Sequence, residues 1–140
     1  MRRYADELGG TVVGDRTDLI VSRIARVEVP SALWRKHRQG ELAADDLATL
    51  LATFESDWIQ AGHDDGPFQI IDVSHGILEL AASSLARHPL RAYDALQLAS
   101  AMAAREVDEG VSEFACFDRQ LREAASAEGF DLLPSRMSRR

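Results

Sequence analysis

One stretch constrains the fold of this chain more than any other, because it is apolar on nearly every side. Residues 91–104 are Arg-Ala-Tyr-Asp-Ala-Leu-Gln-Leu-Ala-Ser-Ala-Met-Ala-Ala, and Pro89 stands just ahead of them. Ala, Leu, Met and Gln favour the helical state, and a proline commonly precedes a helix. The stretch therefore predicts a helix that is buried rather than laid on a surface.

Asp94 is the only acidic residue among residues 91–104. Leu98 and Ala101 follow four and seven residues later, on the same side, so the carboxylate is predicted to point toward an interior. Burying an unpaired carboxylate is costly unless cations or hydrogen-bond donors meet it. The alternative is that Asp94 simply lies in the first turn, where the helix macrodipole favours an acid. Residues 91–104 leave both interpretations open.

The length and composition indicate one soluble domain. The chain has 140 residues, which is enough for one domain with its own core and too few for two. No apolar run approaches the roughly 20 residues of a membrane span, and the N-terminus lacks the apolar core of a signal peptide. Cys116 is the only cysteine, which excludes an internal disulfide and fits a reducing compartment. The predicted location is the cytoplasm.

The charge balance bears on possible partners. A formal net charge of −7 argues against a protein that coats nucleic acid non-specifically. It is compatible with an enzyme that acts on nucleic acid through metal ions, because carboxylates that hold metals add to the acidic count. Basic residues cluster at residues 35–38 (Arg-Lys-His-Arg) and in the tail 136–140. Such runs are typical of solvated helix faces and tails.

Short apolar runs alternate with helix-favouring segments along the whole chain. This alternation predicts an α/β fold in which helices cover both faces of a parallel sheet. Ser22 is predicted to cap the helix that follows it, Pro30 to bend that helix and Gly40 to close it. With no repeat, low-complexity tract or linker, residues 1–140 are predicted to form a single domain. The expected strands are 18–21, 68–73, 113–117 and 130–133, and the expected helices are 2–8, 22–38, 43–59, 74–87, 91–106 and 119–127.

Two further acids are candidates for a functional site. Asp118 follows the strand predicted at 113–117, and open α/β sheets bind ligands at the carboxyl ends of their strands. The alternative for Asp118 is a helix N-cap, a position that Asp favours. Glu28 lies in the helix predicted after Ser22, where a Glu is usually solvent-facing, and it gains interest only in the company of other acids.

Other kinds of site are not indicated. The four histidines lack zinc-ligand spacing, and the chain has no Gly-rich phosphate loop and no Gly-x-Ser-x-Gly elbow. Cys116 is most simply a small core residue in a strand. A purely acidic constellation remains, and its hard oxygen ligands suit Mg²⁺ or Mn²⁺.

Three blocks of the chain together resemble the PIN-domain family. They are residues 22–28 (Ser-Arg-Ile-Ala-Arg-Val-Glu), 90–99 (Leu-Arg-Ala-Tyr-Asp-Ala-Leu-Gln-Leu-Ala) and 117–121 (Phe-Asp-Arg-Gln-Leu). Within that family they resemble the VapC-like ribonuclease toxins of bacterial type II toxin–antitoxin systems. The resemblance runs from about residue 2 to the last predicted strand. The second block is the most specific, and the order and separation of the three blocks agree with the family.

The resemblance implies a PIN-like three-layer α/β/α fold and a Mg²⁺- or Mn²⁺-dependent endoribonuclease that hydrolyses RNA phosphodiester bonds. Residue by residue, it assigns Glu28, Asp94 and Asp118 as the catalytic acids and metal ligands, with Ser22 opening the helix that carries Glu28. It also implies a homodimer and a cognate antitoxin protein that places a segment in the acidic groove. No membrane partner is expected.

The start of the chain departs from the family pattern, which begins with a central strand ending in an Asp, then a small hydroxyl residue and a helix. Here residues 2–5 (Arg-Arg-Tyr-Ala) resemble that helix, and only Met1 precedes them. We therefore expect the chain to be N-terminally truncated relative to the family, without the central strand and its acid. The expectation is poor solubility or inactivity as given, with activity restored by an upstream extension.

Two other interpretations stay open. A catalytically impaired PIN-like protein would act only as an antitoxin- or RNA-binding module, which the missing acid would favour. A phosphoacceptor signalling domain would also place acids at the edge of a parallel sheet. Such domains need a Lys near the acids, and Lys36 is the only Lys in this chain.

Overall fold

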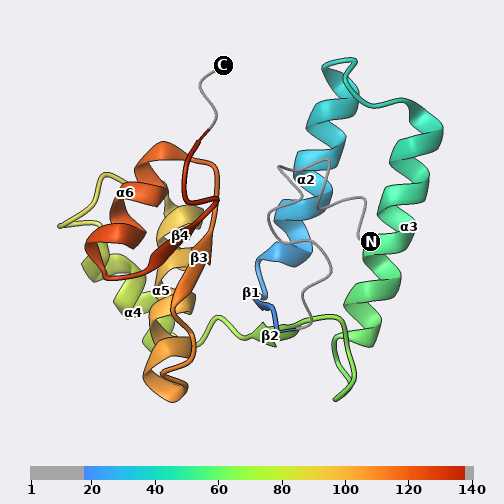
Figure 1. Ribbon diagram of the computed structural model, residues 1–140. Helices are drawn as coiled ribbons and strands as arrows, with labels where there is room; N and C mark the ends of the chain where they lie inside the picture. Colours follow the sequence, from blue (N-terminus) through green and yellow to red (C-terminus); the bar gives the residue numbers. More distant parts are fainter. Residues whose placement is uncertain (1–17, 138–140) are drawn as a thin grey trace. The chain divides into compact units, whose positions relative to one another are not determined.

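The structure, a computed structural model, describes residues 18–137 (Figure 1). The helix predicted at 2–8 and the end of the basic tail lie outside the described residues. Within them, no helix is both long and apolar enough to cross a membrane. One or two helices separate each strand from the next, so the predicted mixed α/β class is confirmed. The described elements are β1 (Ile20–Ser22), α2 (Ala25–Arg38), α3 (Ala44–Gln60), β2 (Gln69–Ile71), α4 (His75–Ser84), α5 (Ala92–Val107), β3 (Glu113–Ala115), α6 (Arg119–Ala127) and β4 (Asp131–Leu133).

The strands are shorter than the apolar runs that predict them, and they pair two by two. β1 pairs with β2 in one sheet, and β3 pairs with β4 in another. The second pair is parallel, with Glu113 opposite Asp131 and Ala115 opposite Leu133. A single sheet that joins all four strands, and with it the three-layer arrangement, stays a prediction.

The chain divides into two compact units, the first ending at Ile70 and the second beginning at Ile71. We call them the N-terminal unit and the C-terminal unit. Each has its own buried apolar side chains. The prediction of a single domain over residues 1–140 stays a prediction.

The core of the N-terminal unit lies between α2 and α3, which run side by side as a helical hairpin (Figure 1). Leu47, Leu50 and Phe54 recur at helical spacing along α3, so they share one face of it. That face packs on Leu33 of α2, and Leu33 and Leu50 are fully buried. The apolar periodicity of residues 43–59 therefore marks a core-facing helix, as predicted.

The two ends of α2 show one wrong prediction and one confirmed one. Ser22 is the last residue of β1 rather than the N-cap of α2; the N-cap is Ile24, which makes no side-chain capping bond. The hydroxyl of Ser22 instead accepts a hydrogen bond from the Ile24 N–H at 3.4 Å, in the turn before the helix. The helix continues through Pro30, and the predicted bend stays a prediction. Gly40 closes α2 with a φ of 77°, a conformation that costs glycine little.

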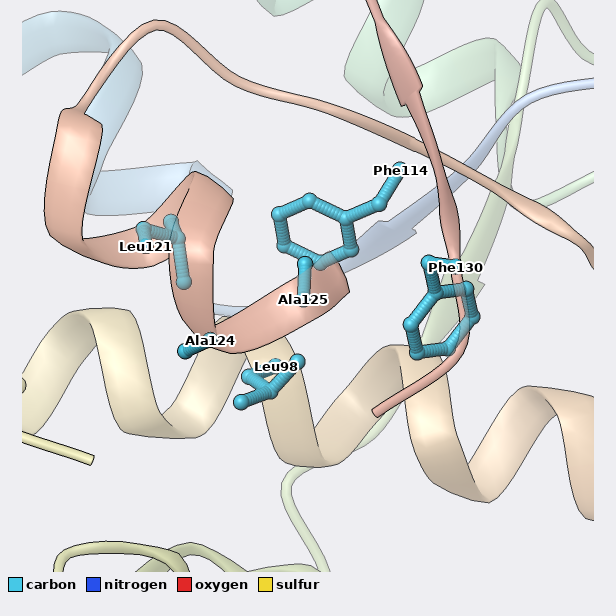
Figure 2. Packing of buried hydrophobic residues seen from close by; sticks show 6 residues of the cluster. All are labelled: Leu98, Phe114, Leu121, Ala124, Ala125 and Phe130. Atoms are coloured by element: carbon cyan, nitrogen blue, oxygen red, sulfur yellow. The ribbon is translucent and has the colours of Figure 1, made fainter. Parts of the chain in front are cut away.

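Helix α5 is buried on two sides within the C-terminal unit, which agrees with its apolar composition. Ala95 and Ala99 pack against Ile77 and Ala81 of α4. Elsewhere on α5, Leu98 packs against β3, α6 and the start of β4 (Figure 2). Tyr93 is 60% exposed, so the burial is not complete all the way round. The buried cluster around Leu98 contains Leu98, Phe114, Leu121, Ala124, Ala125 and Phe130.

Candidate metal site

Asp94 lies in the first turn of α5, three residues after the N-cap Arg91. There it lies at the positive end of the helix macrodipole, as the first-turn interpretation of the sequence predicts. Its side chain is half-buried, and the next residue, Ala95, is buried at 1% exposure. The acid therefore combines a first-turn position with partial withdrawal from solvent.

Asp118 is the N-cap of α6, so its interpretation as a capping residue is confirmed. Its Oδ1 accepts a hydrogen bond from the Leu121 N–H at 2.9 Å. It also follows β3 closely, with only Cys116 and Phe117 between them. The cap occupies one carboxylate oxygen, and the second oxygen can still serve a ligand.

Asp94 and Asp118 interact electrostatically, so the structure brings two of the three candidate acids together. Burial raises the pKa of the Asp94 carboxyl, and the negative charge of Asp118 raises it further. The guanidinium of Arg91 acts in the opposite direction. A divalent cation would relieve the repulsion between the two carboxylates.

The pair of acids lies near Cys116, the residue that directly follows the carboxyl end of β3. Burial raises the pKa of its thiol to about 11, and Arg122 works against that rise. The negative charges of Asp118 and Asp94 also raise the thiol pKa. Cys116 therefore lies near both acids and is a neutral thiol at neutral pH, unlike a cysteine activated for nucleophilic attack.

Arg122 is a buried cation that the sequence prediction did not single out. It is 8% exposed and donates one hydrogen bond to the Cys116 carbonyl at 2.9 Å and another to the Pro134 carbonyl at 2.6 Å. These two carbonyls follow β3 and β4, so Arg122 ties together the carboxyl ends of the parallel strands. The sequence signal that could have pointed to Arg122 is its position, directly after the buried Leu121 and four residues after Asp118.

Glu28 is half-buried in the first turn of α2 and belongs to the N-terminal unit. Its approach to Asp94 and Asp118 in the C-terminal unit therefore stays a prediction. Among residues 18–137, no group of three or more His, Cys, Asp or Glu side chains is positioned to hold a metal ion. The pair of acids nevertheless fits Mg²⁺, which is commonly held by one or two carboxylates together with water and substrate phosphate.

The C-terminal unit also has an open surface hollow, and it does not include the pair of acids. The hollow follows α6 and β4 and has a mixed apolar and charged lining. Because neither Asp94 nor Asp118 lines it, we do not assign the candidate metal to it. Its lining residues are Arg119, Arg122, Glu123, Ser126, Ala127, Leu132 and Met137.

Compared with known proteins, the chain matches no protein-family model and no curated protein. The resemblance to PIN domains therefore depends on the three sequence blocks alone. Two of those blocks carry Asp94 and Asp118, the acids that lie close enough to interact.

Proposed function

We propose that this protein is a Mg²⁺- or Mn²⁺-dependent endoribonuclease with a PIN-like three-layer fold. One observation carries the proposal: one carboxylate lies in the first turn of α5 and another is the N-cap of α6, and both lie near the end of β3. Leu98 of α5 and Leu121 of α6 belong to the same buried cluster, so the two helices next to the carboxylates pack together. The carboxyl end of a strand in an α/β fold is a common place for ligands.

The residues of the chain would prepare the site in three ways. Asp94 and Asp118 would hold the cation with hard oxygen ligands. The Leu121 N–H fixes the orientation of the Asp118 carboxylate, and Arg122 holds the strand ends on which the site depends. When bound, the metal would supply activation of a water molecule and neutralise charge on the scissile phosphate.

The sequence resemblance supports the remaining parts of the proposal. Glu28 is the third acidic ligand, as the resemblance assigns it. The enzyme is a cytoplasmic toxin that forms a homodimer, and a cognate antitoxin protein inhibits it.

Cleavage of a labelled RNA of mixed sequence tests the proposal. The full chain should cut it with Mg²⁺ or Mn²⁺ and not in EDTA. Asp94→Asn and Asp118→Asn should each lower the rate on the order of 100-fold or more, because a bound metal contributes several kcal/mol to transition-state stabilisation. Asn is itself a good N-cap, so Asp118→Asn should keep α6 intact.

Asp131→Asn is the matched control, because Asp131 is an exposed acid of the same unit at the amino end of β4. It should cut RNA at the wild-type rate. Equal rates for wild type, Asp94→Asn and Asp118→Asn would show that the proposal is wrong. Binding of Mn²⁺ and RNA without any cleavage would instead favour the RNA- or antitoxin-binding module.

A further inference from the structure

One face of α2 differs in character from the rest of this acidic chain. It consists of five exposed residues at helical spacing, and none of them is acidic, although Asp and Glu outnumber Lys and Arg by 23 to 16 in the whole chain. Two of the five are large and apolar, with Val27 65% exposed and Trp34 43% exposed. The five residues, which we call the α2 face, are Val27, Ser31, Trp34, Arg35 and Arg38.

Trp34 is the centre of the α2 face. The Arg38 guanidinium lies over its ring, with Cζ 5.9 Å from the ring centroid. The His37 ring approaches it edge-on, at 6.0 Å between centroids and 79° between planes. An exposed indole is thus held next to two nitrogen-rich side chains.

The arginines of this face are not needed to close the helix. Backbone N–H groups of residues 39–41 already bond to the carbonyls of residues 35–37, and Gly40 provides the left-handed turn. Within residues 18–137, neither Arg35 nor Arg38 takes part in an ion pair. Their charges are therefore available to an external anion.

We propose that the α2 face binds single-stranded RNA, with a base stacked on Trp34 and backbone phosphates on Arg35 and Arg38. Every base offers a π-face to an aromatic side chain, and arginine reinforces the stack. Positive charge at the same place complements the phosphates. The inference rests on the proposed function for the choice of RNA, and it identifies a place other than the acids where the substrate is held.

Fluorescence anisotropy of a labelled oligouridylate of about 12 nucleotides tests this inference, with the full chain in EDTA so that metal-dependent cleavage cannot occur. Trp34→Ala should weaken binding about 5- to 150-fold, the equivalent of ~1–3 kcal/mol for one stacked base. Trp34→Phe should retain most of the affinity, because the aromatic face remains. Arg35→Gln and Arg38→Gln should each reduce the slope of log affinity against log salt by about 0.7.

Arg136→Gln is the matched control, because Arg136 is exposed in the other unit and lies outside the α2 face. If Arg136→Gln lost as much RNA affinity as Arg38→Gln does, the attraction would come from diffuse positive charge, and the inference would be overturned. Unchanged RNA affinity in Trp34→Ala, with a dimer converted to a monomer in sedimentation, would also overturn it, since the face would then join two copies.

Failure of this inference can be told apart from failure of the proposed function. Wild-type binding that depends on Trp34, with no cleavage in Mn²⁺, would contradict the proposed function alone. Metal-dependent cleavage with RNA affinity unaffected by Trp34→Ala would contradict the inference alone.

Discussion

At the scale of single residues, Glu128 shows how one carboxylate ties α6 to the segment after α4. Its Oε1 accepts hydrogen bonds from His88 Nε2 at 2.9 Å and from the Arg87 guanidinium at 3.0 Å. The side chains of His88 and Glu128 are only 12% and 18% exposed. The hydrogen bond from His88 is the main reason that the pKa of Glu128 is lowered; burial opposes it, and Arg87 adds to the lowering.

Replacing Glu128 by Gln should destabilise the protein in a pH-dependent way. Because the pKa of Glu128 is lower in the folded state, its contribution is fully present above the unfolded pKa of about 4.3 and is lost as pH falls through the folded pKa. Relative to wild type, Glu128→Gln should therefore lose about 1–3 kcal/mol of unfolding free energy near neutral pH, and this loss should shrink toward zero in acid. Urea unfolding across this pH range measures it.

Glu123→Gln is the control for this pH dependence, since Glu123 pairs with Arg119 in the exposed part of α6. An exposed i,i+4 pair contributes only about 0.3–0.5 kcal/mol, so this variant should stay near wild type throughout. A deficit of Glu128→Gln that is the same at every pH would contradict the role assigned to its charge.

At the scale of elements, the short helix α6 depends on how its ends are closed. Asp118 caps its N-terminus, and at the other end Gly129 takes a φ of 92°. The N–H of Phe130 bonds to the Ala125 carbonyl at 3.0 Å, and both side chains belong to the same buried cluster (Figure 2). The turn after α6 therefore delivers Phe130 into the core, as expected for this type of helix end.

Gly129→Ala and Gly76→Ala should change stability in opposite directions. Gly129 needs a left-handed φ, and an added Cβ would meet the Arg105 guanidinium only at an ordinary 3.6 Å, so the cost is conformational, about 1–2 kcal/mol. Gly76 lies in the first turn of α4, where a Cβ would meet only the Ser74 hydroxyl at 3.9 Å. Alanine there should stabilise by about 0.5–1 kcal/mol. Thermal unfolding measures both, and a stabilised Gly129→Ala would refute the requirement for glycine.

At the scale of the whole molecule, a bound metal should stabilise the folded chain by mass action. A cation at 100 times its Kd adds about 2.7 kcal/mol if it binds only the folded state. Millimolar Mg²⁺ or Mn²⁺ should therefore raise Tm in wild type and in Asp131→Asn, but not in Asp94→Asn. In EDTA, Asp94→Asn should be at least as stable as wild type, because burial and Asp118 disfavour a charge at Asp94. An equal metal-induced shift in Asp94→Asn would place the metal elsewhere.

The same measurement tests whether Glu28 shares the site with the pair of acids. If it does, Glu28→Gln should reduce the metal-induced rise in Tm, and its effect should not add to that of Asp94→Asn, since residues that share a ligand are coupled. Full additivity would assign Glu28 to the N-terminal unit alone.

The sequence by itself determined the features that depend on residues close together in the chain. Helix α3 follows from the apolar spacing of Leu47, Leu50 and Phe54, and the ends of α2 and α6 follow from Gly40 and Gly129. Asp118 could also be predicted as an N-cap from its position alone. These are local effects of helix periodicity and backbone conformation, which act within one or two turns.

Only the tertiary structure decided the features that join distant residues. Ser22 extends β1 because a partner strand far along the chain pairs with it, although locally it resembles an N-cap. Three other interactions likewise join separate elements. They are the two hydrogen bonds donated by Arg122, the hydrogen bond between His88 and Glu128, and the electrostatic interaction of Asp94 with Asp118. No local pattern encodes them, because burial and charge at one residue depend on which other segments fold against it.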